Sequence, residues 1–252
     1  MKKLIIANWK MNPQTAQQAA RHARDIERVA KSLRNVEVVL APPFIYSSII
    51  KNTASLKFGA QDAFWEKGGA YTGEISPAQL KASGVRLVIV GHSERRALGE
   101  TNEIINKKLK AVLGSGMRAV LCVGETEQQK DVAFPKIIKD ELHEGLLRIK
   151  KSLFRNLVIA YEPIWAISTM ARGRADNPKN VYEITTIIRR ELYRMIGKRI
   201  ASKIPVLYGG SVDDKNAYDF IKEGAVDGLL VGGASLNAKK FARILKEADK
   251  IK

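Results

Sequence analysis

The chain has 252 residues, of which 45% are hydrophobic and 27% charged, and its formal net charge is +17. This composition is typical of a globular protein and excludes a disordered, collagenous or low-complexity chain. A single cysteine, Cys122, excludes an intrachain disulfide and a cysteine-rich metal site. No apolar run approaches the roughly 18 residues of a membrane span. Polar residues 8–10 follow the apolar start too soon for a signal peptide, so we expect a cytoplasmic protein with no membrane partner.

Eight short apolar runs recur along the whole chain and predict eight β-strands. Several of them are nearly all apolar, which is typical of strands that are covered on both faces. The runs are residues 4–8, 36–41, 57–61, 87–90, 118–123, 157–161, 205–208 and 228–231.

Longer amphipathic stretches separate these runs and predict helices. Their apolar residues recur at intervals of three and four, for example Ile104, Ile105, Leu109, Val112 and Leu113. Capping residue types predict helix starts at Ser76, Thr101, Asp213 and Asn237.

Eight strand–helix alternations without a linker predict an α/β fold, a single (β/α)8 barrel domain over residues 1–252. The alternative, an open doubly wound sheet, usually carries Gly-x-Gly-x-x-Gly after its first strand. Here the turn at residues 8–13 has no glycine, which favours the barrel.

The positive charge is concentrated in residues 148–203, which contribute +9 of the total. Such a charge makes polyanion binding a function to consider. However, Arg189, Arg190, Arg194, Lys198 and Arg199 fall within a helical stretch, where a solvated face is the simpler explanation. No zinc-finger, homeodomain or aromatic-basic RNA motif accompanies them, so we expect no nucleic-acid partner.

Ionisable residues follow several strands directly, and in such a barrel the active site lies at the carboxyl ends of the strands. Asn8, Lys10, His92, Glu94 and Glu162 would therefore meet at one mouth of the barrel. Lys10 has a simpler explanation as a solvated cation, and His92 as a structural histidine. Glu162 is harder to explain in that way, because a carboxylate facing the mouth has few structural uses. Further residues at strand ends are Gln61, Glu125 and Cys122, the last being most simply a small buried hydrophobe.

Two glycine-rich turns follow the seventh and eighth strands, at residues 209–213 and 231–235. Glycine lets backbone N–H groups approach a ligand closely, and barrels of this type often bind phosphate at these two loops. The two turns together indicate a phosphate site at the ends of the seventh and eighth strands.

Six segments carry motifs in a fixed order: 8–10 (NWK), 69–76 (GAYTGEIS), 91–96 (GHSERR), 160–167 (AYEPIWAI), 208–212 (YGGSV) and 228–236 (GLLVGGASL). Together they resemble the triosephosphate isomerase family over essentially the whole chain. The resemblance implies the glycolytic and gluconeogenic interconversion of dihydroxyacetone phosphate and D-glyceraldehyde 3-phosphate, with no cofactor and no metal. The segment at 69–76 resembles the loop through which two subunits of the family interlock, which implies a homodimer with Thr72 near the neighbouring subunit's site.

The same resemblance implies a role for each site residue. Glu162 is the base that moves the proton, and neutral His92 polarises the carbonyl oxygen. A short helix starting at Ser93 would disfavour a positive charge on that imidazole. Lys10 supplies a positive charge for the enediolate and the phosphate, while Glu94 holds its ammonium. By the same resemblance, Asn8 also contacts the substrate, and Ser211, Gly232 and Gly233 bind the phosphate.

One segment departs from the family. Its lid normally reads Ile-Gly-Thr-Gly, with a proline five residues after the second glycine. Here Ile167 precedes STMARG, and Pro178 lies five residues after Gly173. The simplest alignment places Ser168 at the first glycine, whose N–H meets the phosphate, and leaves three extra residues. The implied lid contact is therefore Ser168, with Gly173 as the alternative.

Two other functions stay open at this point. A barrel that has lost its activity could be retained as a polyanion-binding protein, which the net charge and the altered lid suggest. A phosphate-binding barrel could also carry a different chemistry, because a fold alone does not determine function. The second alternative predicts different residues at positions 10, 92 and 162, and they match the isomerase motifs instead.

Overall fold

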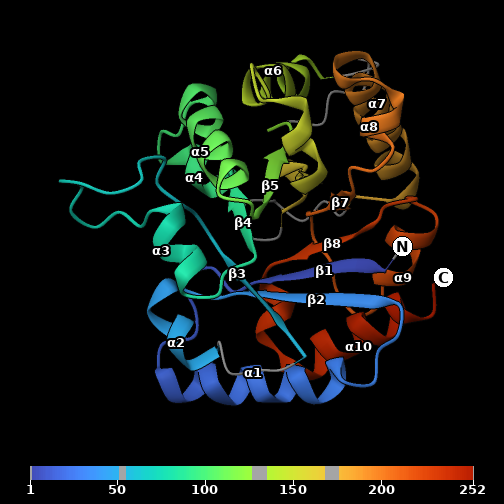
Figure 1. Ribbon diagram of the computed structural model, residues 1–252. Coiled ribbons are helices and arrows are strands. Elements are labelled where there is room, and N and C mark those ends of the chain that lie inside the picture. Colours follow the sequence, from blue (N-terminus) through green and yellow to red (C-terminus); the bar gives the residue numbers. More distant parts are fainter. Residues whose placement is uncertain (1, 51–54, 127–134, 168–175, 252) are drawn as a thin grey trace.

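Eight parallel strands close into a barrel in chain order, with β1 hydrogen-bonded to β8 (Figure 1). The computed structural model describes residues 2–50, 55–126, 135–167 and 176–251. The strands are β1 Lys3–Asn8, β2 Val36–Ala41, β3 Lys57–Ala60, β4 Leu87–Val90, β5 Arg118–Val123, β6 Leu157–Tyr161, β7 Val206–Tyr208 and β8 Gly228–Val231. All eight predicted strands are present within one residue at each end, which confirms the predicted (β/α)8 barrel fold.

The strands are buried on both faces, which explains their nearly continuous apolar sequences. Alternate side chains of a strand point to opposite faces. On β1, Leu4 and Ile6 belong to a cluster made only of strand residues, which fills the barrel interior. Ile5 and Ala7 belong to a larger cluster that includes helix residues and lies between the strands and the helices. The barrel is thus a packed core, and a ligand can enter only at its ends.

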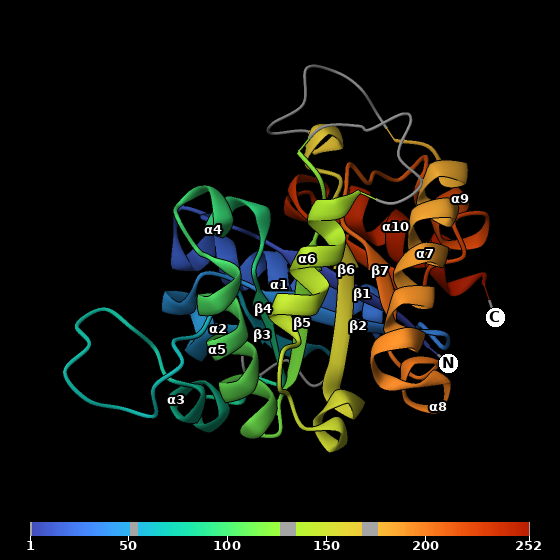
Figure 2. The same ribbon diagram turned by 90° about the horizontal axis from the view of Figure 1, so that it is seen from above.

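The helices surround the barrel and carry the predicted caps at three of four positions (Figure 2). Ser76 and Gln79 form a capping box at α3, while Thr101 and Asn237 cap α5 and α10. The helices are α1 Ala16–Ala30, α2 Ser47–Ile50, α3 Pro77–Ala82, α4 Ser93–Ala97, α5 Asn102–Gly114, α6 Lys136–Gly145, α7 Pro178–Ile196, α8 Lys198–Ala201, α9 Ala217–Lys222 and α10 Ala238–Asp249. Short 3₁₀ helices lie at Phe44–Tyr46, Lys151–Asn156, Ile164–Ala166 and Gly233–Leu236.

Two local predictions on the helices were wrong. Asp213 does not start a helix: its Oδ1 accepts from the amides of Lys215 and Asn216, and α9 begins only at Ala217. An aspartate closes a turn with the same hydrogen bonds that it uses to cap a helix, so the residue type alone could not separate the two. The basic stretch is also not one helix, because Gly197, with φ of +88°, separates α7 from α8.

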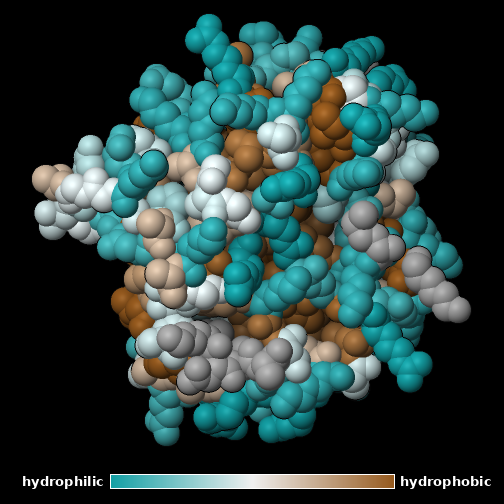
Figure 3. All heavy atoms as spheres, viewed as in Figure 1, coloured by the Kyte–Doolittle hydropathy of each residue, from teal (hydrophilic) through white to brown (hydrophobic). Residues whose placement is uncertain are grey.

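The surface agrees with the solvated explanation of the basic residues. Hydrophilic residues cover most of the face shown in Figure 3, with hydrophobic residues visible mainly between them. Arg190, Lys198 and Arg199 are exposed, and Arg189 pairs with Asp227 at 2.7 Å. None of the helices in the described ranges is long and apolar enough to cross a membrane. The two termini lie near one another in Figures 1 and 2.

Candidate active site

A cavity of about 410 Å³ opens at the carboxyl ends of the strands. Asn8, Lys10, His92 and Glu162 line it together with the loops that follow β7 and β8. The structure therefore brings these four predicted residues together from β1, β4 and β6. Three other polar residues of the cavity wall were not predicted from the sequence, namely Asn216, Asn237 and Lys240. They come from the start of α9 and α10, and although the sequence marks Asn237 as a helix cap, no motif marks any of the three as part of a site.

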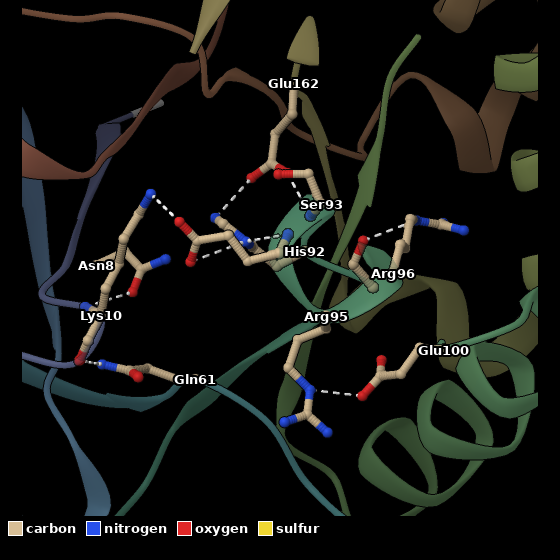
Figure 4. A network of polar contacts seen from close by, with 11 residues as sticks. Asn8, Lys10, Gln61, His92, Ser93, Arg95, Arg96, Glu100 and Glu162 are labelled. Carbon is tan, nitrogen blue, oxygen red and sulfur yellow. Dashed lines mark hydrogen bonds and ion pairs between the residues drawn. The ribbon is translucent and has the colours of Figure 1, made fainter. Parts of the chain in front are cut away.

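Glu162 directly follows β6, and its side chain is almost fully buried, with 2% of its surface exposed. Its Oε2 accepts a hydrogen bond from the amide of Ser93 at 3.1 Å, and its Oε1 lies 3.5 Å from His92 Nε2 (Figure 4). Gly209, behind the carboxylate, could not carry a side chain, because a Cβ there would lie 2.9 Å from Glu162 Cγ. The carboxylate of Glu162 and the imidazole of His92 thus face each other at the wall of the cavity.

The hydrogen bonds of His92 define a neutral ring. The backbone amide of Glu94 donates to His92 Nδ1 at 3.2 Å. An amide can only donate, so Nδ1 carries no proton, and the ring N–H lies on Nε2. His92 is also the N-cap of α4, whose N-terminal dipole opposes a positive charge on the ring. The Nε2–H group is therefore available as a hydrogen-bond donor beside Glu162.

Lys10 is held in an unusual backbone conformation, with φ of +52°. Non-glycine residues in this region are strained and persist only where their surroundings fix them. The amide of Lys10 donates to Asn8 Oδ1 at 3.1 Å, and the side-chain amide of Gln61 donates to the Lys10 carbonyl at 2.8 Å. The Lys10 ammonium pairs with Glu94 Oε1 at 2.6 Å (Figure 4). Gln61 thus stabilises the backbone conformation of Lys10, and Glu94 fixes the position of its ammonium.

The two glycine-rich loops form the part of the cavity wall beside Glu162 and Lys10, because Gly209 packs against Glu162 and Gly232 against Lys10. Ser211, Gly232 and Gly233 all line it. The hydroxyl and the amide of Ser211 both donate to the carbonyl of Ala166, at 2.6 and 3.2 Å. Ser211 is therefore joined to the segment that precedes the lid. The predicted lid contact Ser168, its alternative Gly173 and the three extra residues lie outside the described residues.

A buried carboxylate next to this segment was placed at a strand end from the sequence but not given a role. Glu125 Oε1 accepts from the Tyr161 hydroxyl at 2.8 Å and from Trp165 Nε1 at 2.7 Å. Burial raises the pKa of Glu125, although both hydrogen bonds oppose that shift. Glu125 thus fixes the side chain of Trp165 and the backbone that leads from β6 toward the lid.

Asp176, the first described residue after position 167, is a second buried carboxylate that the sequence did not reveal. Its Oδ1 accepts from the Asn177 amide and from Asn180 Nδ2, both at 2.8 Å. Its Oδ2 is buried and makes no close hydrogen bond among the described residues, although the buried Tyr208 hydroxyl interacts with this carboxyl and lowers its pKa. Burial raises the pKa of Asp176 to about 6.

This pKa predicts how Asp176→Asn changes stability. A carboxyl whose pKa is raised by folding stabilises the fold in its protonated form, and this contribution is lost as pH rises through about 6. Asparagine resembles the protonated form and can place its amide at the position of Oδ2. We expect the free energy of unfolding to rise by about 3 kcal/mol at pH 8 and to stay unchanged at pH 3. Denaturant unfolding of both proteins at the two pH values measures this, and an equal change at both would contradict it.

The fold and the cavity define a class of protein, the (β/α)8 barrels whose mouth brings a carboxylate, an imidazole and an ammonium together with two glycine-rich loops. Among the described residues, no cluster of three or more His, Cys, Asp or Glu side chains could hold a metal ion. The more specific assignment comes from comparison with known proteins. The family model described as triosephosphate isomerase matches residues 3–248.

Individual relatives agree with the family match over nearly the same length. The triosephosphate isomerase of Dictyoglomus thermophilum is 40% identical over 251 residues, which cover 97% of this chain and 99% of the relative. The triosephosphate isomerase of Carboxydothermus hydrogenoformans is 40% identical over 97% of this chain and 98% of its own length. That of Thermodesulfovibrio yellowstonii is 41% identical over 97% of this chain and 99% of its own length. The chain belongs to the triosephosphate isomerase family, which confirms the resemblance found in the sequence.

Proposed function

We propose that this chain, as one catalytic domain, interconverts dihydroxyacetone phosphate and D-glyceraldehyde 3-phosphate, with Glu162 as the base. The family supplies the reaction, a step of glycolysis and gluconeogenesis. The observation that carries the residue assignment is the pairing of a buried Glu162 carboxylate with a neutral His92 on one cavity wall. The enzyme acts in the cytoplasm, where glycolytic substrates occur, and uses no cofactor.

The proposed mechanism moves one proton between adjacent carbons. Glu162 accepts the proton from the carbon next to the carbonyl, and the electron pair of that C–H bond forms the double bond of an enediolate. The Nε2–H of His92 donates to the substrate oxygen that gains charge, and the Lys10 ammonium stabilises the same charge. Asn8 adds a hydrogen-bond donor, since its side-chain nitrogen has no partner among the described residues. Glu162 then returns the proton to the neighbouring carbon, while His92 passes the hydroxyl proton from the first oxygen to the second, so the old carbonyl becomes a hydroxyl, the old hydroxyl becomes a carbonyl, and no electrons enter or leave.

The phosphate is bound by the two glycine-rich loops. Ser211, Gly232 and Gly233 provide backbone N–H groups there, and glycine permits the close approach that such binding needs. The Ser211 hydroxyl donates to the Ala166 carbonyl, so a phosphate bound at Ser211 competes with this hydrogen bond. Because the phosphate and Ala166 compete for Ser211, phosphate binding is coupled to the position of the segment around Ala166. The resemblance to the family implies one more phosphate contact from the lid, at Ser168 or at Gly173, and both lie outside the described residues.

A coupled isomerase assay on the purified protein tests the proposed function. We expect turnover of both triose phosphates without added metal or cofactor. Turnover of a different phosphorylated substrate alone would support another chemistry in the same site. Salt-dependent retention on nucleic acid without any turnover would support a polyanion-binding protein instead.

We further propose that the protein is a homodimer joined through residues 64–72. This loop extends away from the barrel beyond α3 in both ribbon views (Figures 1 and 2). Phe64, Trp65 and Tyr71 stack on one another in it, with ring centroids 4.0 and 4.7 Å apart. Near the mouth of the barrel, Met11 and Leu98 are 86% and 81% exposed, and such large apolar side chains favour a protein interface.

The dimer makes a prediction about concentration. Thr72 of one subunit would contact the other subunit near Asn8 and Lys10, so a monomer has an incomplete site. We expect sedimentation at micromolar concentration to show a dimer and specific activity to fall on dilution. Replacing Thr72 by arginine should shift the protein toward monomer and lower its activity at the same concentration. A fully active monomer in sedimentation would refute the proposed interface.

A further inference from the structure

A buried ion pair lies directly behind the candidate active site and is not part of the mechanism above. Glu141 on α6 is 4% exposed, and its Oε1 lies 3.2 Å from Arg96 Nη1 on α4. Its Oε2 accepts from the backbone amide of Gly124 at 2.9 Å. Burying two charges is costly unless their remaining groups are satisfied. Here the second oxygen of Glu141 and two nitrogens of Arg96 all form hydrogen bonds with backbone groups around the site.

Arg96 connects Glu141 to the strand end that carries His92. Its Nε donates to the carbonyl of Gly91, the residue before His92, at 2.9 Å. Its Nη2 donates to the carbonyl of Cys122 on β5 at 3.2 Å. The rigid guanidinium therefore fixes the end of β4 against the end of β5.

Gly124 connects Glu141 to the strand end that carries Glu162. The amide of Glu162 donates to the Val123 carbonyl at 2.8 Å, and the amide of Ile164 donates to the Glu125 carbonyl at 2.9 Å. Gly124 lies between these two acceptors and packs so closely that a Cβ atom on it would overlap the Glu162 carbonyl. The hydrogen bond from the Gly124 amide to Glu141 thus fixes the backbone after β5, to which the backbone of Glu162 is hydrogen-bonded.

The charges around Glu141 make its ionisation sensitive to the site. Burial raises the pKa of Glu141 to about 7, while Arg96 and the Gly124 amide lower it. Glu162 and Glu125 face it as like charges, and both raise its pKa. The neighbouring Cys122 thiol is neutral, because burial raises its pKa. Toward α7, His143 of the same helix pairs with Glu191 at 2.7 Å.

We propose that Glu141 is a positioning residue for the isomerisation, and that its charged form, paired with Arg96, sets the distance between Glu162 and His92. The inference rests on the proposed function. Because catalysis depends on the placement of these two groups, a shift of either group by about 1 Å lowers the rate of the reaction. Protonation of Glu141 cancels the charge of the pair and loosens the link from α6 to both strand ends.

The variant Glu141→Gln tests this role, because the amide oxygen can still accept from Gly124 but the charge is lost. We expect kcat at pH 8.5 to fall about tenfold with KM unchanged. As pH falls from 8.5 to 6, wild-type Glu141 is protonated, so the difference between the two proteins should narrow toward twofold or less. The matched control is Glu191→Gln, which removes another buried and ion-paired carboxylate on α7. It should leave kcat and its pH profile as in the wild type.

Unchanged kcat in Glu141→Gln, or a loss of the same size at every pH, would overturn the proposal. Thermal unfolding checks that each variant is folded. If Glu141→Gln does not fold, Arg96→Lys provides a second test, because one ammonium cannot contact Glu141, Gly91 and Cys122 together. It should lower kcat without changing KM, and wild-type kcat would refute the role. Absence of turnover in the wild type would refute the proposed function. The ratio of the kcat of each variant to the kcat of the wild type tests only the role of Glu141.

Discussion

Replacing Glu162 by glutamine is expected to lower kcat by about 10²–10⁴-fold, the contribution of a well-placed general base. The amide has the shape of the carboxylate but cannot accept a carbon-bound proton. Its oxygen can still accept from the Ser93 amide, which is 3.1 Å from Glu162 Oε2. The side chain is buried, so a change of shape would disturb the wall of the cavity, and glutamine avoids that. We therefore expect the fold and the binding of triose phosphate to persist.

The measurement is kcat and KM in the coupled assay, together with binding of a phosphate-bearing enediolate mimic. Glu191→Gln is again a suitable control, because it removes a buried carboxylate far from the cavity and should leave kcat unchanged. A kcat near the wild-type value in Glu162→Gln would show that Glu162 is not the base. A loss of mimic binding of the same size as the loss of kcat would show that the residue acts by binding.

The strand ends could be predicted from the sequence because each one depends on local information. Strands buried on both faces have nearly continuous apolar sequences, and the polar residue that follows marks the mouth. Asn8, His92 and Glu162 were therefore placed correctly from short motifs. The same holds for Ser76 and Thr101, whose caps need only residues three positions away.

The supporting residues could not be predicted because their partners are distant in the sequence. Glu141 lies on an amphipathic helix and differs from an exposed glutamate only through Arg96 and Gly124, which the fold brings to it. The same is true of Asp176, whose pKa depends on burial. The use of Gln61 as a support for Lys10 depends on the strained turn after β1, which no residue type in the sequence indicates.

The second large effect is expected for Lys10→Met, which removes an ammonium from the cavity but keeps an unbranched side chain of similar length. We expect kcat/KM to fall by about 10²–10³-fold, the cost of losing one preorganised group that stabilises developing negative charge. Methionine experiences the same backbone strain as lysine at φ of +52°, and the hydrogen bonds of Gln61 and Asn8 to the backbone remain. Glu94 loses its partner but is 38% exposed in its side chain, so water can solvate it.

Lys240→Met separates the specific role of Lys10 from a general effect of positive charge. Lys240 lines the same cavity, is exposed, and its ammonium has no ion pair among the described residues. A charge of this kind attracts a phosphate over a distance and is screened by salt, so its loss should raise KM a few-fold at low salt and leave kcat unchanged. Lys10→Met should instead lower kcat at every salt concentration, because the ammonium acts at contact distance on the enediolate. Equal losses in the two variants, both abolished by salt, would show that Lys10 acts only as part of the positive field of the cavity.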